Sequence, residues 1–370
     1  MTGRKLEKLY IITRSMKAGG CERVIAQLAN RFCATGTDVS LFSVYRHDSF
    51  YPLDERITVR PLSDREEGSS RDTFAVFRLF RKCVLEGKPD AVLAMPDMIN
   101  VWTSLFLAGT GIPVIVSERN DPARFPASRL KRLLRKPAYR FAKGFVFQTE
   151  QQKAYFPERI RNRGTVIENP LDTEMLPSVF EGQRNRTVVT AARLAPQKNL
   201  TLLIDAFRIF SESRPDWKLI IYGEGSERNH LEKAAAEAHP GTVILPGECR
   251  ELAEAIRTAG MFVLSSDYEG MPNALIEAMS LGLPCVSTDC PAGGPASLIF
   301  QEKNGILVRT GDARGMAEAM GRIADDPAFA ARIGKEAERI RQRLDVRTVA
   351  EKWRSYIERV IENNKERTEG

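Results

Sequence analysis

The 370-residue chain has few of the residues from which most metal centres are built. Its three histidines are scattered at positions 47, 230 and 239, and its six cysteines form neither a Cys-x-x-Cys pair nor a zinc-binding spacing. No Asp-x-Asp sequence occurs, so a common carboxylate motif that binds divalent cations is missing as well. The sequence therefore predicts no metal site and no metal cofactor.

Long apolar runs are also missing. No stretch of about eighteen apolar residues occurs, and the short apolar segment near the start is typical of a strand, so we expect neither a membrane-spanning helix nor a secretory signal. We expect a cytoplasmic protein with reduced thiols. The net charge of +7 is a modest excess that suits anionic substrates or an anionic membrane surface.

What is present is an alternation of short apolar segments with amphipathic ones. Such a pattern is typical of parallel sheets covered on both faces, so it predicts an α/β fold with doubly wound, Rossmann-like domains. The expected strands are 9–13, 39–45, 91–95, 113–117, 144–149, 165–169, 187–194, 218–225, 242–247, 261–266 and 284–289.

The alternation breaks over residues 170–183, which are polar and have no period, and this indicates a linker. Because the chain is longer than one hydrophobic core usually supports, we expect two domains, residues 1–172 and 184–345. Residues 346–364 carry apolar side chains at helical spacing. They predict a terminal helix that either covers the second domain or crosses back to the first.

Two segments of the second domain follow directly on expected strands, where open parallel sheets bind their ligands. In AARLAPQKN, Arg193 and Lys198 offer a guanidinium fork and a point charge, which suit a diphosphate. In YGEGSER, Gly223 and Gly225 let backbone pass close to a ligand, but Arg228 replaces the third glycine of a dinucleotide fingerprint. The alternative for the first segment is a solvated loop with two surface cations, and the alternative for the second is a tight turn.

A third segment, SDYEGMPNALIEAM (266–279), places two glutamates around a helix start. Pro272 suits the first helical turn, so the next backbone N–H groups are expected to favour a phosphate. Glu269 precedes this turn and Glu277 lies about one turn into the helix, so both carboxylates can border one pocket. A sugar nucleotide has hydroxyls on both sides of its diphosphate and suits this arrangement. The alternative interpretation is that Glu277 is an ordinary exposed helix residue.

The stretch EGMPNALIEAM resembles the E-x7-E motif of retaining glycosyltransferases of family 4, which have the GT-B fold. ARLAPQKN, YGEGSER, NGILV (304–308) and the early AGGCERV match in the same order, so the resemblance covers essentially the whole chain. It implies two Rossmann-like domains facing across a cleft, with a nucleotide-sugar, most simply a UDP-sugar, bound mainly by the second. It also implies retention of anomeric configuration without a metal.

The resemblance assigns roles to residues. It implies that Arg193 and Lys198 bind the donor diphosphate, that Glu269 meets the transferred sugar and that Glu277 meets the ribose. The catalytic residues are then Arg193, Lys198 and Glu269. The donor-binding residues are Gly20, Gly223, Gly225, Asn273, Ala274, Leu275 and Glu277. A front-face mechanism is favoured, in which the cations and the helix N-terminus stabilise the leaving diphosphate, although a covalent intermediate stays open.

The acceptor side is expected in the first domain. In the family, Gly19 and Gly20 end the first strand and let a loop approach the phosphates. Many members carry a histidine after the strand that here spans 113–117, but this chain has SERN (117–120). That resembles a subgroup handling N-acetylhexosamines in polysaccharide, lipid-linked oligosaccharide or glycoprotein pathways. Arg119 and Asn120 are therefore acceptor-side candidates, and Arg119 either meets an acceptor phosphate or pairs with a neighbouring acid.

A basic segment completes the first domain. Residues 122–149 contain no acid, and SRLKRLLRKPAYRFAK (128–143) combines leucines at helical spacing with many cations. Such helices are typical of membrane-surface anchors. The expected membrane-surface residues are Arg129, Lys131, Arg132, Arg135 and Lys136. The alternative is a domain helix with its leucines in the core. Nucleic acid is not expected, because no binding module or aromatic interleaving is present.

These features predict a peripheral glycosyltransferase on the inner face of the cell membrane. We expect it to move a hexose or N-acetylhexosamine from a UDP-sugar to a glycan acceptor, polyprenyl-linked, for cell-surface polysaccharide or glycoconjugate synthesis. Two alternatives stay open. One is an epimerase or phosphorylase of the same fold, and the other is a catalytically silent subunit that binds sugar nucleotides or acts as a scaffold.

Overall fold

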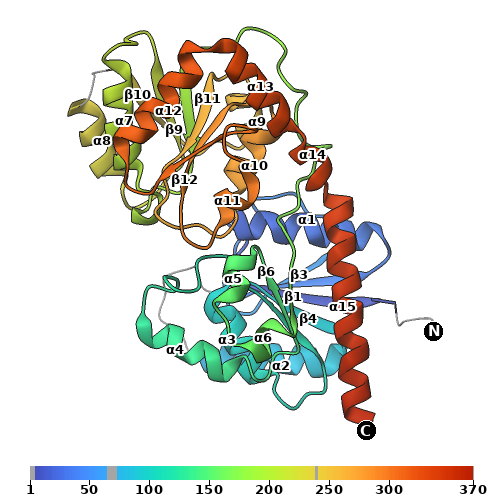
Figure 1. The fold of residues 1–370 in the computed structure, drawn as a ribbon. Coiled ribbons are helices and arrows are strands. Elements are labelled where there is room, and N and C mark those ends of the chain that lie inside the picture. Colours follow the sequence, from blue (N-terminus) through green and yellow to red (C-terminus); the bar gives the residue numbers. More distant parts are fainter. Residues whose placement is uncertain (1–4, 65–72, 238–240, 370) are drawn as a thin grey trace. The chain divides into compact units, whose positions relative to one another are not determined.

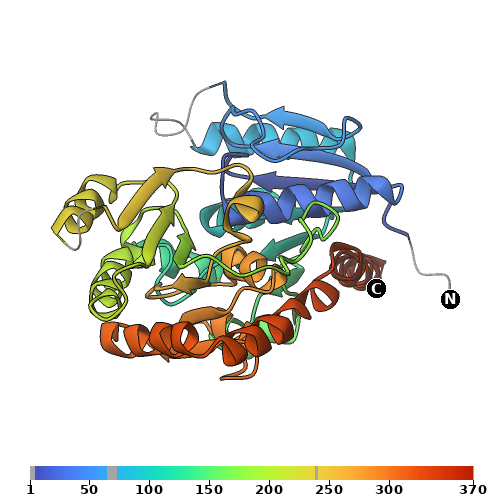
Figure 2. The same ribbon diagram turned by 90° about the horizontal axis from the view of Figure 1, so that it is seen from above.

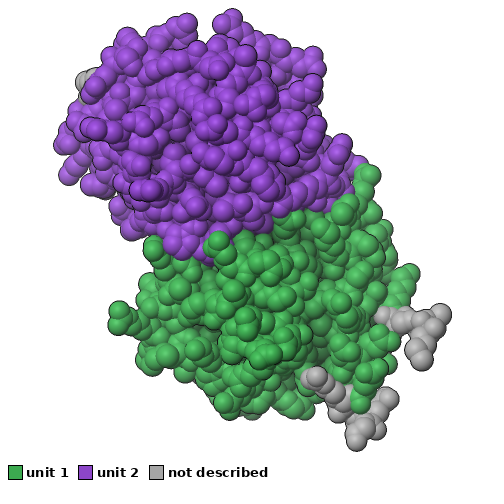
Figure 3. Space-filling model, in the orientation of Figure 1, with its two compact units in different colours: residues 1–170, 346–370 green, residues 171–345 purple. Residues whose placement is uncertain are grey.

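The computed structural model describes residues 5–64, 73–237 and 241–369. The chain divides into two compact units, one of residues 1–170 and 346–370 and the other of residues 171–345 (Figure 3). In each unit a parallel sheet separates two hydrophobic clusters, so helices cover both sheet faces (Figures 1 and 2). Among the described residues, no helix is both long and apolar enough to cross a bilayer.

The first unit has a seven-stranded parallel sheet in the order β3-β2-β1-β4-β5-β6-β7. Its strands are β1 (Lys8–Thr13), β2 (Asp38–Ser43), β3 (Thr58–Pro61), β4 (Ala91–Ala94), β5 (Val114–Ser117), β6 (Gly144–Phe147) and β7 (Gly164–Val166). Its helices are α1 (Gly20–Ala34), α2 (Thr73–Gly87), α3 (Asp97–Phe106), α4 (Arg129–Ala138), α5 (Glu150–Ala154), α6 (Glu158–Arg161) and α15 (Val346–Glu369).

The terminal helix α15 packs beside α1 in this first unit (Figure 1). The fully buried Trp353 anchors it in the hydrophobic cluster beneath the sheet. The hydroxyl of Tyr356 accepts a hydrogen bond from the Phe145 N–H (2.7 Å) and donates one to the Arg163 carbonyl (2.5 Å). The last helix of the chain is thereby fixed against strand β6.

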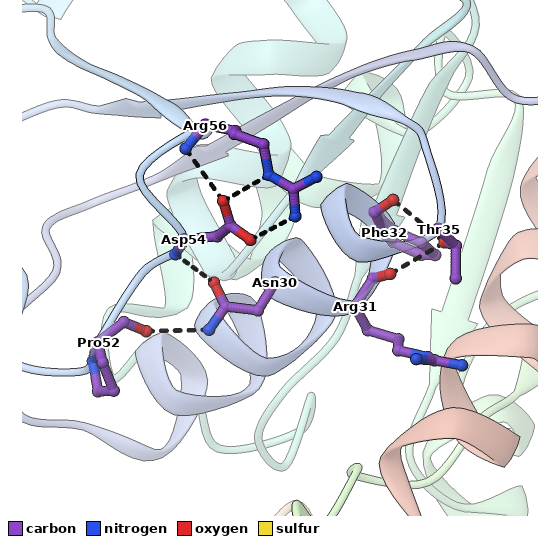
Figure 4. A network of polar contacts seen from close by, with 7 residues as sticks. All are labelled: Asn30, Arg31, Phe32, Thr35, Pro52, Asp54 and Arg56. Carbon is purple, nitrogen blue, oxygen red and sulfur yellow. Dashed lines mark hydrogen bonds and ion pairs between the residues drawn. The ribbon is translucent and has the colours of Figure 1, made fainter.

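The connection between β2 and β3 is tied to α1 by polar contacts (Figure 4). The Asn30 side chain donates to the Pro52 carbonyl (3.0 Å) and accepts from the Asp54 N–H (2.9 Å). Arg56 donates to both carboxylate oxygens of Asp54 (2.9 and 2.7 Å), and these bonds lower the pKa of Asp54. This connection leads to β3, an edge strand whose four residues are all exposed and which the apolar pattern did not predict.

The second unit has a six-stranded parallel sheet in the order β10-β9-β8-β11-β12-β13. Its strands are β8 (Thr187–Ala191), β9 (Lys218–Tyr222), β10 (Val243–Gly247), β11 (Met261–Leu264), β12 (Cys285–Asp289) and β13 (Ile306–Arg309). Its helices are η1 (Pro196–Lys198), α7 (Leu200–Ser211), α8 (Arg228–Glu237), α9 (Leu252–Ile256), α10 (Asn273–Ser280), α11 (Gly294–Leu298), α12 (Ala313–Asp325), α13 (Pro327–Glu338) and α14 (Ile340–Arg343).

The strand order positions the candidate site of this unit. The chain runs outward from β8 to β10 on one side and from β11 to β13 on the other, so the order reverses between β8 and β11. Ligands of doubly wound sheets bind beyond the carboxyl ends of the strands at such a switch point. The loops that leave β8 and β11 there contain residues 192–199 and 265–272, which hold three of the residues singled out from the sequence.

Candidate functional site

Lys198 and Glu269 form an ion pair at the switch point of the second unit. Nζ of Lys198 lies 2.5 Å from Oε1 of Glu269, and the Ser266 hydroxyl donates to the same oxygen at 2.7 Å. The lysine side chain is 18% exposed and the glutamate side chain 7%, so the pair is largely withdrawn from water. The structure therefore brings together a cation and an acid that the sequence offered in separate motifs.

Three further contacts join the two loops that carry this pair. The Gln197 side chain donates to the Tyr268 carbonyl (2.8 Å), and the Asn199 side chain donates to the Asp267 carboxylate (2.8 Å). The Ser265 hydroxyl donates to the Lys198 carbonyl (2.9 Å). Sequence reasoning missed these positioning residues. The one available signal was Asn199, whose type before an apolar helical segment predicts the N-cap that it forms on α7.

Helix α10 carries the second glutamate and begins one residue later than expected. Pro272 is its N-cap, with φ −78° and ψ 110°, rather than part of its first turn. The first N–H groups of the helix, from Asn273 onward, lack intrahelical acceptors by geometry, as the phosphate-binding prediction requires. Glu277 is only 2% exposed, so the alternative of an ordinary exposed helix residue is wrong.

Gly223 and Gly225 are required by contacts inside the protein. A Cβ on Gly223 would lie 2.0 Å from the Ala192 carbonyl oxygen, and one on Gly225 would lie 2.2 Å from that of Leu194. Both have positive φ values, +131° and +157°. The expected close approach of backbone therefore exists, but it is to the loop that carries Arg193. The loop after β9 thus supports the loop after β8.

Arg193 and Cys290 complete the surroundings of this site. Arg193 is exposed, and its side chain has no hydrogen-bond or ion-pair partner within the described parts of the chain. Burial and the charge of Glu269 raise the pKa of the Cys290 thiol to about 12. Arg193 can therefore reach a ligand, whereas Cys290 is a neutral group and not a nucleophile at ordinary pH.

Gly19 and Gly20 lie where α1 begins, after strand β1 of the first unit. The Tyr51 hydroxyl donates to the Gly19 carbonyl (3.1 Å), and no side chain caps the helix at Gly19. A Cβ on Gly19 would lie 2.2 Å from Oε2 of Glu22, so this carboxylate occupies the space beside the helix start. An acid at a helix N-terminus stabilises the helix, so Glu22 has a structural role at the start of α1.

Arg119 follows β5 and is paired with neither of the acids beside it. Its guanidinium donates to Oδ1 of Asn169 (2.5 Å) and to the Ser117 hydroxyl (3.4 Å), both uncharged. Burial lowers its pKa to about 10. The alternative that Arg119 pairs with Glu118 or Asp121 is therefore wrong. Asn120 lies next to it, and its carbonyl accepts from the Gln152 side chain (3.1 Å).

Arg135 corrects one prediction for the basic helix α4. It was expected at a membrane surface, but it is 2% exposed and points into the unit. Its Nε lies 3.5 Å from the buried Glu118 carboxylate, and it donates to the carbonyls of Pro122 (3.1 Å) and Phe125 (2.5 Å). Tyr139 also donates to Glu118. Helical spacing alone could not reveal that this arginine compensates a buried acid.

The rest of α4 presents an apolar and basic surface. Leu130 and Leu133 are 69% and 67% exposed, and Leu134 and Phe141 are also exposed, so the interpretation that placed the leucines in the core is wrong. The remaining cations predicted for this surface are Arg129, Lys131 and Lys136, which are exposed, and Arg132, which is half-buried. Arg132 donates to the carbonyls of Pro126 (2.6 Å) and Ala127 (2.8 Å).

Potential metal ligands do not gather anywhere in the described residues, where no group of three or more His, Cys, Asp or Glu side chains could hold an ion. The candidate residues of the first and second units therefore offer cations, carboxylates and the N–H groups of helix starts. Such groups bind anions and hydroxyls and can stabilise a leaving phosphate.

Two family models match the chain. The model described as glycosyl transferases group 1 matches residues 173–340, and the one described as glycosyltransferase family 4 matches residues 18–175. The chain belongs to glycosyltransferase family 4. A similar curated relative is an enzyme of Campylobacter jejuni, 25% identical over 95% of this chain and 99% of its own. Its name is GalNAc-α-(1→4)-GalNAc-α-(1→3)-diNAcBac-PP-undecaprenol α-1,4-N-acetyl-D-galactosaminyltransferase.

Other matches agree on family and fold. The amylovoran biosynthesis glycosyltransferase AmsD of Erwinia amylovora is 27% identical over 79% of this chain and 83% of its own. Among solved structures, Anabaena HepE in complex with UDP and glucose has a TM-score of 0.78 at 19% identity, covering 94% of this chain and 98% of its own. Staphylococcus aureus TarM has a TM-score of 0.80 at 13% identity, covering 95% and 98%. This glycosyltransferase therefore has the GT-B fold and is similar to enzymes of polysaccharide and oligosaccharide synthesis.

Proposed function

We propose that this glycosyltransferase moves a hexose or N-acetylhexosamine from a UDP-sugar to a glycan carried on a polyprenyl diphosphate, with retention and without a metal. The observation that carries the proposal is the Lys198–Glu269 pair at the switch point. The proposal of UDP is supported by the HepE complex, in which UDP is the bound nucleotide. The proposal of the acceptor is supported by the name of the Campylobacter relative.

In the donor site, Arg193 and Lys198 bind the diphosphate together with the N-terminus of α10. A partly buried lysine and an arginine fork are strong partners for phosphate oxygens. Glu269, already held by Lys198, accepts from hydroxyls of the transferred sugar, and Glu277 accepts from the ribose. Asn273, Ala274 and Leu275 contribute backbone N–H groups.

The reaction proceeds on one face of the sugar. The bond between the anomeric carbon and the diphosphate oxygen breaks, and the bond to the acceptor oxygen forms on the same face. The departing phosphate oxygen takes the acceptor proton. Arg193, Lys198 and the helix N-terminus stabilise the charge that develops on the leaving group. Because Oε1 of Glu269 is held by Lys198 and Ser266, this carboxylate is better suited to orient the sugar than to attack it.

The enzyme works at the inner face of the cell membrane, which it contacts through α4. Exposed leucines beside Arg129, Lys131 and Lys136 combine apolar insertion with attraction to anionic lipids, which contributes about 1 kcal/mol per cation. Gly19, Arg119 and Asn120 then belong to the acceptor side. A polyprenyl-linked acceptor resides in the same membrane.

A transfer assay tests the proposal. Wild type and Lys198→Met are incubated with UDP-glucose, UDP-galactose and their N-acetyl counterparts, a polyprenyl-diphosphate-linked saccharide and EDTA. The proposal predicts one preferred donor, an axial product linkage by NMR, full activity in EDTA and little activity in the variant. Loss of activity in EDTA contradicts the metal-free mechanism. Tight UDP binding without transfer to any acceptor favours the silent-subunit alternative.

A further inference from the structure

We propose that Arg119 is the centre of an anion site in the first unit that binds the phosphate group of the acceptor. The inference rests on the proposed function for the identity of the anion, but the site itself is argued from the surroundings of the guanidinium.

Arg119 carries a charge that the protein does not neutralise. All its polar partners in the described chain are uncharged, namely Asn169 Oδ1 and the Ser117 hydroxyl, and its Nε is buried with no partner. The neighbouring acids are engaged elsewhere. Glu118 pairs with Arg135 at 3.5 Å, and Asp121 pairs with Arg124 at 3.7 Å. A cation withdrawn from water without a counter-ion is costly, so an anion from outside is the missing partner.

The side chain is held ready for such a partner. Asn169 Oδ1, which accepts from Arg119, also accepts from the Gln148 side chain at 2.7 Å. The guanidinium is therefore fixed by a side-chain network rather than left to sample rotamers. Part of Arg119 stays exposed, and arginine presents a planar fork that fits two phosphate oxygens at once.

The start of α1 adds a second source of positive potential. Arg119 and Cys21, in the first turn of α1, are close enough for each to influence the other's pKa. The helix has 15 residues and no side-chain cap at Gly19, so its dipole adds positive potential there, which the Glu22 carboxylate beside the helix start offsets in part. The burial of Cys21 raises the pKa of its thiol, so it adds no negative charge. The Glu22 and Asp97 carboxylates are near enough to raise the pKa of Cys21 as well, but neither is paired with Arg119 in the described chain, so the guanidinium is still without a counter-ion.

Phosphate could reach this site from either substrate, and one titration separates the two sources. Wild type is first saturated with UDP, and inorganic pyrophosphate is then titrated by calorimetry as a mimic of the acceptor diphosphate. The inference predicts a second binding event in wild type. It predicts that Arg119→Gln lowers the affinity for pyrophosphate by about 10- to 100-fold, because charge-assisted hydrogen bonds are lost. The affinity of this variant for UDP is unchanged. Arg119→Lys retains part of the binding.

Arg161→Gln is the matched control, because it removes an exposed arginine of the same unit, at the end of α6, and should leave both affinities unchanged. Thermal unfolding confirms that each variant is folded, and removal of an uncompensated cation should not lower the melting temperature. No pyrophosphate binding to the UDP complex, or equal binding by Arg119→Gln, overturns the inference. Weakened UDP binding in Arg119→Gln also overturns it, because the anion is then the donor's. If wild type binds no UDP, the proposed function fails, while pyrophosphate titration of the free protein still tests Arg119.

Discussion

Lys198 and Glu269 are 71 positions apart in the chain, yet their charged atoms lie 2.5 Å apart. The topology of the second unit produces this contact. Strands β8 and β11 are neighbours because the strand order reverses between them, so the loops that follow the two strands meet at one edge of the sheet. Because it joins these two loops, the pair is a structural element as well as a candidate donor-binding group.

The pair should stabilise the second unit. Lys198→Met leaves a carboxylate that is 7% exposed without its cation, and we expect the free energy of unfolding to fall by about 3 kcal/mol. Combining it with Glu269→Gln removes the uncompensated charge and should restore most of that loss. Urea denaturation of both single variants and the double variant measures this coupling. Strictly additive effects of the two substitutions contradict it.

Gly223, the first residue after β9, should be needed for folding. Gly223→Ala places a methyl group 2.0 Å from a backbone oxygen that cannot move freely, so we expect a loss of more than about 3 kcal/mol. Gly311 also has a positive φ, +81°, but nothing lies within 4 Å of its Cβ position. Gly311→Ala should therefore cost only about 1–2 kcal/mol. Equal losses in urea denaturation of the two variants would refute the steric explanation.

Arg135 should matter for stability, whereas its neighbour Arg129 should not. Arg135→Met leaves the buried Glu118 carboxylate without its cation and leaves the carbonyls that accept from the guanidinium without their donor. We expect this to lower the free energy of unfolding by about 3–5 kcal/mol. Arg129→Met, one turn or more away on the exposed face, should change the free energy of unfolding by less than about 0.5 kcal/mol. Chemical denaturation distinguishes them. A mild effect at Arg135 means that Glu118 is compensated by Tyr139 instead.

The apolar surface of α4 should control membrane affinity. Leu130→Ser with Leu133→Ser removes two highly exposed leucines, and we expect binding to anionic vesicles to fall by about tenfold or more. Leu85→Ser is the control, because Leu85 is 44% exposed on α2, outside this surface. Flotation with phosphatidylglycerol-containing vesicles measures the partitioning. If all variants float equally, α4 is not the membrane contact.

The periodic features of the chain could be predicted well from sequence. Every expected strand corresponds to an observed one, because buried parallel strands are continuous apolar runs. Strand β3 was missed because a short, exposed edge strand has no such run. Strand β13 was recognised only as the motif NGILV, and not as an element. Periodicity therefore identifies elements that bury side chains and misses those held by backbone pairing.

Side-chain partners could not be predicted from the sequence. The types and order of Arg193, Lys198, Glu269 and Glu277 indicated an anion-binding edge, but not that lysine and glutamate would pair. The destination of Arg135 could not be read from helical spacing either, because it depends on Glu118, which is 17 residues earlier on a different element. Long-range charge compensation depends on tertiary structure, whereas sequence patterns report mainly local burial.

Calorimetric titration of UDP, GDP and ADP without metal, into wild type and Glu277→Ala, tests the central claim most directly. The account predicts that UDP binds most tightly and that the variant binds it at least about tenfold more weakly, since a buried carboxylate that accepts from the ribose is lost. Thermal unfolding of the variant shows whether it is folded. Failure of wild type to bind any of the three nucleotides, or equal UDP affinity in a folded Glu277→Ala, would contradict the donor site proposed for the second unit.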